Sequence, residues 1–202
     1  AGQLEARLHT QAEVVARFVG VVLLVDYLRG APDDNLEIAL DRLQAPEPTD
    51  WLHLIGLLCD VVQRRSDPPA MRQPLAGWRR RHAHADRDGL QQLAYVLQLR
   101  QQGLTATQVD ASFEASRHLE ALLEATLDLL ESLRFLGAWR LLRVVELTTL
   151  RHKGFAGRVQ LFVGGAEAPD AVAATWSAHL VTDALYLVDP NATQFLEVSP
   201  LL

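Results

Sequence analysis

The pattern of apolar and polar residues predicts a run of amphipathic helices over the first two thirds of the chain. From residue 4 to 29 apolar residues recur at helical spacing, and the run ends at Gly30 and Pro32. The same spacing predicts a short helix opened by Asn35 and three longer helices, at 50–65, 88–101 and 105–134. The last helix is expected to pack through its apolar residues Phe113, Leu119, Leu122, Leu123, Leu127, Leu130 and Leu133.

Capping residues place the starts of two of these helices. Thr49 or Asp50 is expected to open the helix at 50–65, and Thr105 or Thr107 the long helix that follows the polar segment LRQQGLTATQ. The two consecutive helices within 88–136, with this junction between them, are the element around which the rest of the chain is organised.

After Gly137 the pattern changes to clusters of β-branched residues. Segments 139–150 (WRLLRVVELTTL) and 157–165 (GRVQLFVGG) predict strands, and residues 183–198 predict a hairpin that turns at Asp189, Pro190 and Asn191. We therefore expect a mainly α fold: a helical bundle over 1–137, with a small β-rich appendage over 138–202 packed on the bundle.

Composition narrows the function classes. The 202-residue chain has a net charge of −6 and a pI of about 5.6, which argues against a general nucleic-acid binder. A single cysteine, Cys59, cannot form an internal disulfide, so a reducing, cytoplasmic setting is expected, with the thiol buried in an apolar run. The longest apolar stretch, 18–28, is interrupted by Asp26, and no membrane span is predicted. Because the chain starts at Ala1 without a methionine, we expect it to be a piece of a larger protein.

The segment WRRRHAHADRD, residues 78–88, is the most conspicuous cluster of chemically capable side chains. His82, His84 and Asp86 reproduce the first three ligands of the H-x-H-x-D-H pattern of zinc hydrolases. Arg87 stands where the next ligand belongs and cannot bind a metal. The helical pattern also lacks the sandwich fold and the distant ligands of those enzymes, so no metal and no cofactor are predicted.

Two interpretations of the same segment remain. Arg79 and His84 have the R-x4-H spacing of a metal-free ribonuclease pair, in which the imidazole transfers protons and the guanidinium stabilises the phosphate. Alternatively the segment is a solvated basic loop, in which Arg79, Arg80 and Arg81 contact an acidic partner.

The long helix carries an acidic stripe of Glu120, Glu124, Asp128 and Glu131. This stripe is either solvated or faces a basic surface such as the arginine loop of a second copy.

Three stretches of the chain together match a known family pattern: LQLRQQGLTA at 97–106, the Leu-rich segment and its continuation at 122–147, and LYLVDPNATQFLEVSPLL at 185–202. They resemble the HEPN superfamily, especially the helical modules of bacterial multidomain signalling and conflict-system proteins. The resemblance covers roughly residues 12–202, and it implies a HEPN-like helical bundle with a small C-terminal β-hairpin or sheet.

The resemblance also implies which residues of this chain stand at the positions of the family's active centre. The catalytic Arg of the family falls on Arg100, its polar Asn on Gln101 and its catalytic His on Thr105. Threonine does not titrate near neutral pH and cannot replace the imidazole, so the motif is degenerate, and these three residues remain candidates for holding an anion. A competing alignment uses Arg79, Arg80 and His84 and keeps a histidine.

The function implied is therefore non-enzymatic. We expect a sensor, scaffold or dimerisation module attached to an effector in a larger bacterial protein. Its expected partners are a second copy of the chain and an effector domain or other protein. The alternative is a metal-independent ribonuclease of HEPN type that uses an Arg/His pair and so binds nucleic acid.

Overall fold

The computed structural model of the protein describes residues 2–30, 36, 40, 47–65, 70–79, 87–105, 111–150, 154–162 and 170–199. The chain divides into two compact units, Ala1–Arg134 and Phe135–Leu202. The boundary lies within a short 3-10 helix, η2, Arg134–Ala138, close to the change of pattern after Gly137.

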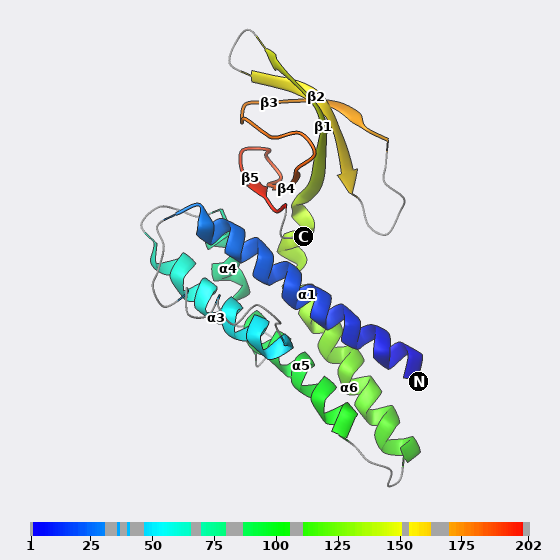
Figure 1. Ribbon diagram of the computed structural model, residues 1–202. Coiled ribbons are helices and arrows are strands. Elements are labelled where there is room, and N and C mark those ends of the chain that lie inside the picture. Colours follow the sequence, from blue (N-terminus) through cyan, green and yellow to red (C-terminus); the bar gives the residue numbers. More distant parts are fainter. Residues whose placement is uncertain are drawn as a thin grey trace. The chain divides into compact units, whose positions relative to one another are not determined.

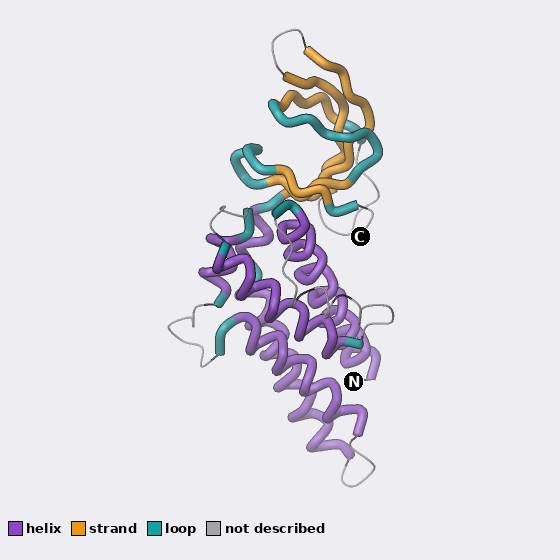
Figure 2. Tube along the Cα trace, turned by 60° about the vertical axis from the view of Figure 1, so that its left-hand side comes forward, coloured by secondary structure: helices purple, strands orange, loops and turns teal. Residues whose placement is uncertain are grey.

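The helical unit contains five helices in its described part, four of which run side by side (Figures 1 and 2). Helix α1 contacts α3, α5 and α6, and α5 also packs along α6. Close packing of α1 on α3 depends on Gly20, because a Cβ at that position would clash with the Trp51 ring. The helices are α1 Gly2–Leu28, α3 Pro48–Arg64, α4 Arg72–Trp78, α5 Gly89–Thr105 and α6 Ala111–Ser132.

The boundaries of two helices differ from those predicted. Helix α3 has Glu47 as its N-cap and Pro48 in its first turn, and Asp50 accepts the Glu47 backbone N–H at 2.8 Å instead of capping the helix itself. Helix α5 continues through Thr105, so this residue ends one helix instead of opening the next. Most of the short helix expected after Asn35 lies outside the described residues, although Leu36 and Leu40 are helical and Leu36 is buried.

The second unit is an antiparallel sheet with strand order β3-β2-β1-β4-β5. Strands β1 and β2 form a long hairpin, and a β-bulge between Val144 and Glu146 shifts its register. Gly157 lies beside the bulge, where a Cβ would clash with the Glu146 carbonyl oxygen. The strands are β1 Arg140–Leu150, β2 Gly154–Phe162, β3 Val172–Trp176, β4 Leu185–Val188 and β5 Phe195–Glu197.

The β unit has a hydrophobic core of its own. Tyr186 and Val188 of β4 are buried in it, together with Val144 and Val159 from the long hairpin. Burial raises the pKa of the Tyr186 hydroxyl, which donates to Glu197 at 3.1 Å and accepts the Val181 backbone N–H at 2.8 Å. The sheet therefore has the buried core of a packed unit.

The hairpin predicted at 183–198 is confirmed, because β4 and β5 pair antiparallel across the turn at Asp189. The Asp189 carboxylate accepts the backbone N–H groups of Asn191, Thr193 and Gln194 and the Thr193 hydroxyl. Burial by itself would raise the pKa of this carboxyl, but the four hydrogen bonds together hold the pKa below its ordinary value. A charged Asp189 therefore fixes the turn.

The prediction of a mainly α fold with a small β appendage is wrong. The structure combines a helical unit with a five-stranded antiparallel sheet in its described part, and so belongs to the α+β class. Two causes account for the error. The strand at 139–150 was predicted, but not that β1 pairs on both sides and so joins the two hairpins into one sheet. The alanine-rich β3 was missed, because its composition does not favour strands.

Candidate functional site

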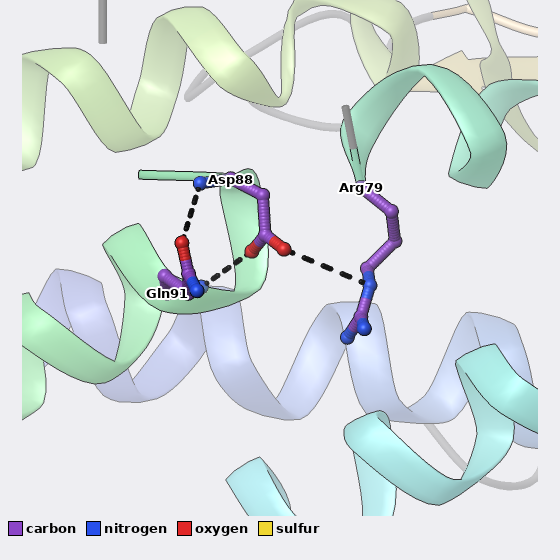
Figure 3. A network of polar contacts seen from close by, with 3 residues as sticks. All are labelled: Arg79, Asp88 and Gln91. Carbon is purple, nitrogen blue, oxygen red and sulfur yellow. Dashed lines mark hydrogen bonds and ion pairs between the residues drawn. The ribbon is translucent and has the colours of Figure 1, made fainter. Parts of the chain in front are cut away.

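The corner between α4 and α5 holds the one described residue of the predicted Arg/His pair, Arg79. Its Nε lies 3.8 Å from Oδ2 of Asp88, and both side chains are partly buried (Figure 3). Asp88 is also the N-cap of α5: it accepts the Gln91 backbone N–H at 2.8 Å, and Gln91 Oε1 accepts the Asp88 N–H at 3.0 Å. This reciprocal pair is a capping box, which satisfies two backbone donors at the helix start.

A buried tryptophan fixes the same corner from the inside. Trp78 is 1% exposed, and its indole N–H donates to the Ser132 hydroxyl of α6 at 3.1 Å. Gly89 lies so close to the indole that a Cβ there would clash with it. Arg79 follows Trp78 directly and ends α4, so its position is set by helix packing and by Asp88.

The described ion-pair partner of Arg79 is therefore Asp88, and the Arg79/His84 pair stays a prediction. His84, Arg80 and Arg81, like His82 and Asp86 of the zinc-like pattern, lie outside the described residues. Arg87 is described and exposed, and its guanidinium stacks over the Tyr95 ring at 3.7 Å. Among the described residues no group of three or more His, Cys, Asp or Glu side chains is arranged to hold a metal ion.

The residues aligned with the HEPN active centre all belong to the last turns of α5. Arg100, Gln101 and Thr105 have helical backbone there, while their side chains lie outside the described part of the chain. Helix α5 thus extends beyond its predicted end at residue 101, through the polar junction to Thr105.

A buried carboxylate joins α1 to the start of α4. Asp26 is 3% exposed, and its two oxygens accept the backbone N–H groups of Ala70 at 3.1 Å and Met71 at 2.9 Å. Burial raises the pKa of this carboxyl, while the hydrogen bonds and the nearby Arg29 and Arg65 oppose the rise. These bonds supply partners to backbone donors ahead of α4, so Asp26 is a structural residue.

The raised pKa of Asp26 predicts a pH dependence of stability. A folded chain that holds this proton more tightly than the unfolded chain is stabilised below the ordinary carboxyl pKa of 3.8, and the contribution is lost as the pH rises through the folded pKa. We expect the free energy of unfolding of Asp26→Asn, minus that of the wild type, to increase as the pH rises from about 4. Denaturant titrations of both chains from pH 4 to 7 measure this difference, and a difference that stays constant over the range contradicts the assignment.

Cys59 is confirmed as a buried thiol. It is 0% exposed, and burial raises its pKa to about 12 even though the nearby Arg79 opposes the rise. The thiolate that nucleophilic chemistry requires is therefore absent at neutral pH.

Helix α6 carries the feature that the sequence interpretation missed. Leu122 and Leu129 are buried, as helical periodicity requires of the face toward the bundle, and Leu133, directly after the helix, is buried too. Three further leucines that were expected to pack are exposed: Leu123 by 40%, Leu127 by 57% and Leu130 by 47%. Their i, i+4, i+7 spacing places them on one face of α6, which we call the leucine stripe.

The predicted acidic stripe lies next to the leucine stripe. All four acidic residues are exposed, and at 3.6 residues per turn their mean direction is roughly 90° from that of the leucines. Glu131 forms an exposed ion pair with Arg134 at 3.3 Å, one turn further along. The four acidic residues are Glu120, Glu124, Asp128 and Glu131.

A signal for the leucine stripe existed in the sequence, because the α6 leucines are too many for one helix face.

Among the described residues, one helix is long and apolar enough to cross a membrane, judged by length and composition alone. It is the stretch Ala6–Leu28 of α1, with 59% of its apolar window buried inside the structure. The core helix of a water-soluble bundle has the same properties, so this stretch is weak evidence for a membrane span.

Compared with protein-family models, curated proteins and solved structures, the chain matches none of them. The resemblance to HEPN domains therefore stays a prediction that rests on sequence motifs.

Proposed function

We propose that the chain is a non-enzymatic interaction module, whose α6 binds a basic amphipathic helix of a partner protein such as an effector. The observation that carries this proposal is the leucine stripe on α6. Exposed apolar patches with a polar rim are typical of protein-binding surfaces, and leucines at i, i+4 and i+7 match the anchors of helix recognition.

The charges beside the stripe favour a basic partner. In an antiparallel pair of two α6 helices, the two-fold axis brings both acidic stripes to the same side, where they repel each other. Leucines of a basic helix instead cover the leucine stripe while its lysines or arginines meet Glu124 and Asp128. The repulsion disfavours an antiparallel second copy, and we assign the α6 face to a different, basic protein.

The same proposal accommodates the HEPN resemblance of the helical unit. On the HEPN alignment Thr105, at the end of α5, stands where that family carries the histidine that cleavage of RNA requires. Arg79 of the alternative pair lies 3.8 Å from Asp88. Both points support a module that binds and does not cleave.

A labelled synthetic peptide tests the proposal. The probe is a helix with leucines on one face and lysines beside them, and fluorescence anisotropy gives its Kd for the full chain. We expect Leu127→Gln to weaken binding at least about ten-fold, because loss of a central anchor costs more than about 1.4 kcal/mol. Replacing Glu124 and Asp128 together by lysine is expected to weaken binding and to reduce its dependence on salt.

The matched control is Leu28→Gln on α1, because Leu28 is 59% exposed and Leu127 is 57% exposed. A second control peptide carries glutamate in place of lysine and is expected not to bind. Equal affinities of the Leu127→Gln chain and the wild type for the basic peptide would refute the proposal.

A further inference from the structure

The outer edge of the sheet is open at β3. This strand is the last in the sheet order and pairs with β2 on one side, from Phe155↔Trp176 to Val159↔Val172. On its other side no strand of the described chain pairs with it, and no described backbone group bonds to it outside that ladder. Within the described residues the outward N–H and C=O groups of β3 therefore have no strand partner, as an edge that accepts another strand requires.

The edge lacks the features that usually prevent strands from pairing between molecules. The five residues of β3, VAATW, contain no charge and no proline, and the strand pairs with β2 without a bulge. The opposite edge differs, since β5 has three residues and ends in Glu197. Of the two edges, β3 is the one suited to accept a strand.

The face of the sheet that packs on the core of the β unit ends at β3, where one of its apolar residues is left exposed. Val172, Ala174 and Trp176 alternate onto one face, where Ala174 and Trp176 pack against the core of the β unit. Val172 is 47% exposed because nothing in the described chain continues this face beyond β3. A further strand on the edge needs apolar residues at alternate positions to cover Val172.

We propose that a second copy of the chain supplies this strand, so that the two β3 strands pair antiparallel about a two-fold axis at Ala174. In this register Val172 lies opposite Trp176 of the second copy, and Ala173 lies opposite Thr175. Aromatic and β-branched residues form favourable cross-strand pairs, the small Ala174 meets itself at the axis, and no like charges are opposed. An isologous contact of this kind joins two chains and then closes.

This self-association is independent of the α6 surface. It places the dimer expected from the sequence at the sheet edge instead of at the helices. A Leu127→Gln chain is accordingly expected to keep the dimer while it loses the basic peptide, so that the two proposals fail separately.

Two double variants of the full chain test the pairing. Ala173 and Thr175 are both exposed, and in the proposed register they lie opposite each other in the two copies. Ala173→Glu combined with Thr175→Glu opposes like charges twice, whereas Ala173→Glu combined with Thr175→Lys opposes unlike charges. Within one chain Ala173 pairs with Arg158, which accommodates the new glutamate in either variant.

Sedimentation equilibrium over a concentration series gives the dissociation constants. We expect the wild type to dimerise, the first variant to dimerise at least ten-fold more weakly, and the second to keep the dimer. A wild type that stays monomeric overturns the proposal and leaves the edge to another protein. Self-association unchanged in the first variant, or lost in both, overturns the register.

Amide hydrogen exchange of the wild type adds a readout that needs no substitution. Slower exchange within Val172–Trp176 at dimer-forming concentrations is expected. Exchange that does not change with concentration in this strand contradicts pairing at β3 even if the chain dimerises elsewhere.

Discussion

Replacing Leu129 by alanine is expected to lower the free energy of unfolding of the helical unit by about 2–5 kcal/mol. Leu129 is 1% exposed on the face of α6 that packs in the bundle, so the shorter side chain leaves a cavity. Leu127→Ala, two residues earlier on the same helix, is expected to change that free energy by no more than about 0.5 kcal/mol, because Leu127 is 57% exposed.

Denaturant titrations followed by the helix signal in circular dichroism measure both variants. The comparison separates the two sets of α6 leucines, since helix propensity changes equally in the two substitutions. A cost for Leu127→Ala as large as that for Leu129→Ala would show that the leucine stripe is packed and is not available to a partner.

Trp78→Ala is expected to destabilise the helical unit by about 3–5 kcal/mol. The indole is buried at the α4–α5 corner, donates to Ser132 and fits against Gly89, so its removal leaves a large cavity at a junction of three helices. The same substitution is expected to loosen the position of Arg79, which follows Trp78 in the chain.

Trp78→Phe is the matched control for this prediction, because it keeps most of the ring and removes the N–H donor. We expect it to cost less than Trp78→Ala. The phenylalanine loses a hydrogen bond worth about 1 kcal/mol, whereas the alanine leaves a much larger cavity. Free energies of unfolding from denaturant titration are again the measurement. A stable Trp78→Ala chain would mean that the corner is not a structural element, which would reopen the interpretation of Arg79 as a functional residue.

The sequence predicted the long helices because their apolar residues follow a single strong period. It predicted the β4–β5 hairpin for a local reason, since Asp189 and the residues after it form a turn through their own hydrogen bonds. Such signals are contained in a few consecutive residues, and tertiary contacts do not need to be known to interpret them.

Other features depended on contacts between distant segments. Strand β3 is rich in alanine, and it forms a strand because β2 supplies a hydrogen-bonding ladder to it. Likewise, threonine is a residue type that commonly caps the start of a helix, yet α5 continues to Thr105. The missed strand contributed to the wrong fold class, because the sheet that includes β3 is larger than the predicted appendage.

The candidate site was the least predictable part. Sequence spacing singled out Arg79 as a partner for His84, but the structure shows its guanidinium beside Asp88, a residue whose capping role was not foreseen. Conversely, Leu123, Leu127 and Leu130 were assigned to the core because periodicity identifies apolar faces without showing which of two faces is covered. Only the packing of α6 in the bundle shows which face of the helix is covered and which is exposed.

The most direct test of the interaction-module account is the Kd of the basic amphipathic peptide for the Leu127→Gln chain, measured beside the Leu28→Gln chain. The account predicts that Leu127→Gln binds at least about ten-fold more weakly than the wild type, while Leu28→Gln binds as the wild type does. Equal weakening by both substitutions, or by neither, would contradict the assignment of the leucine stripe on α6 as the partner-binding surface.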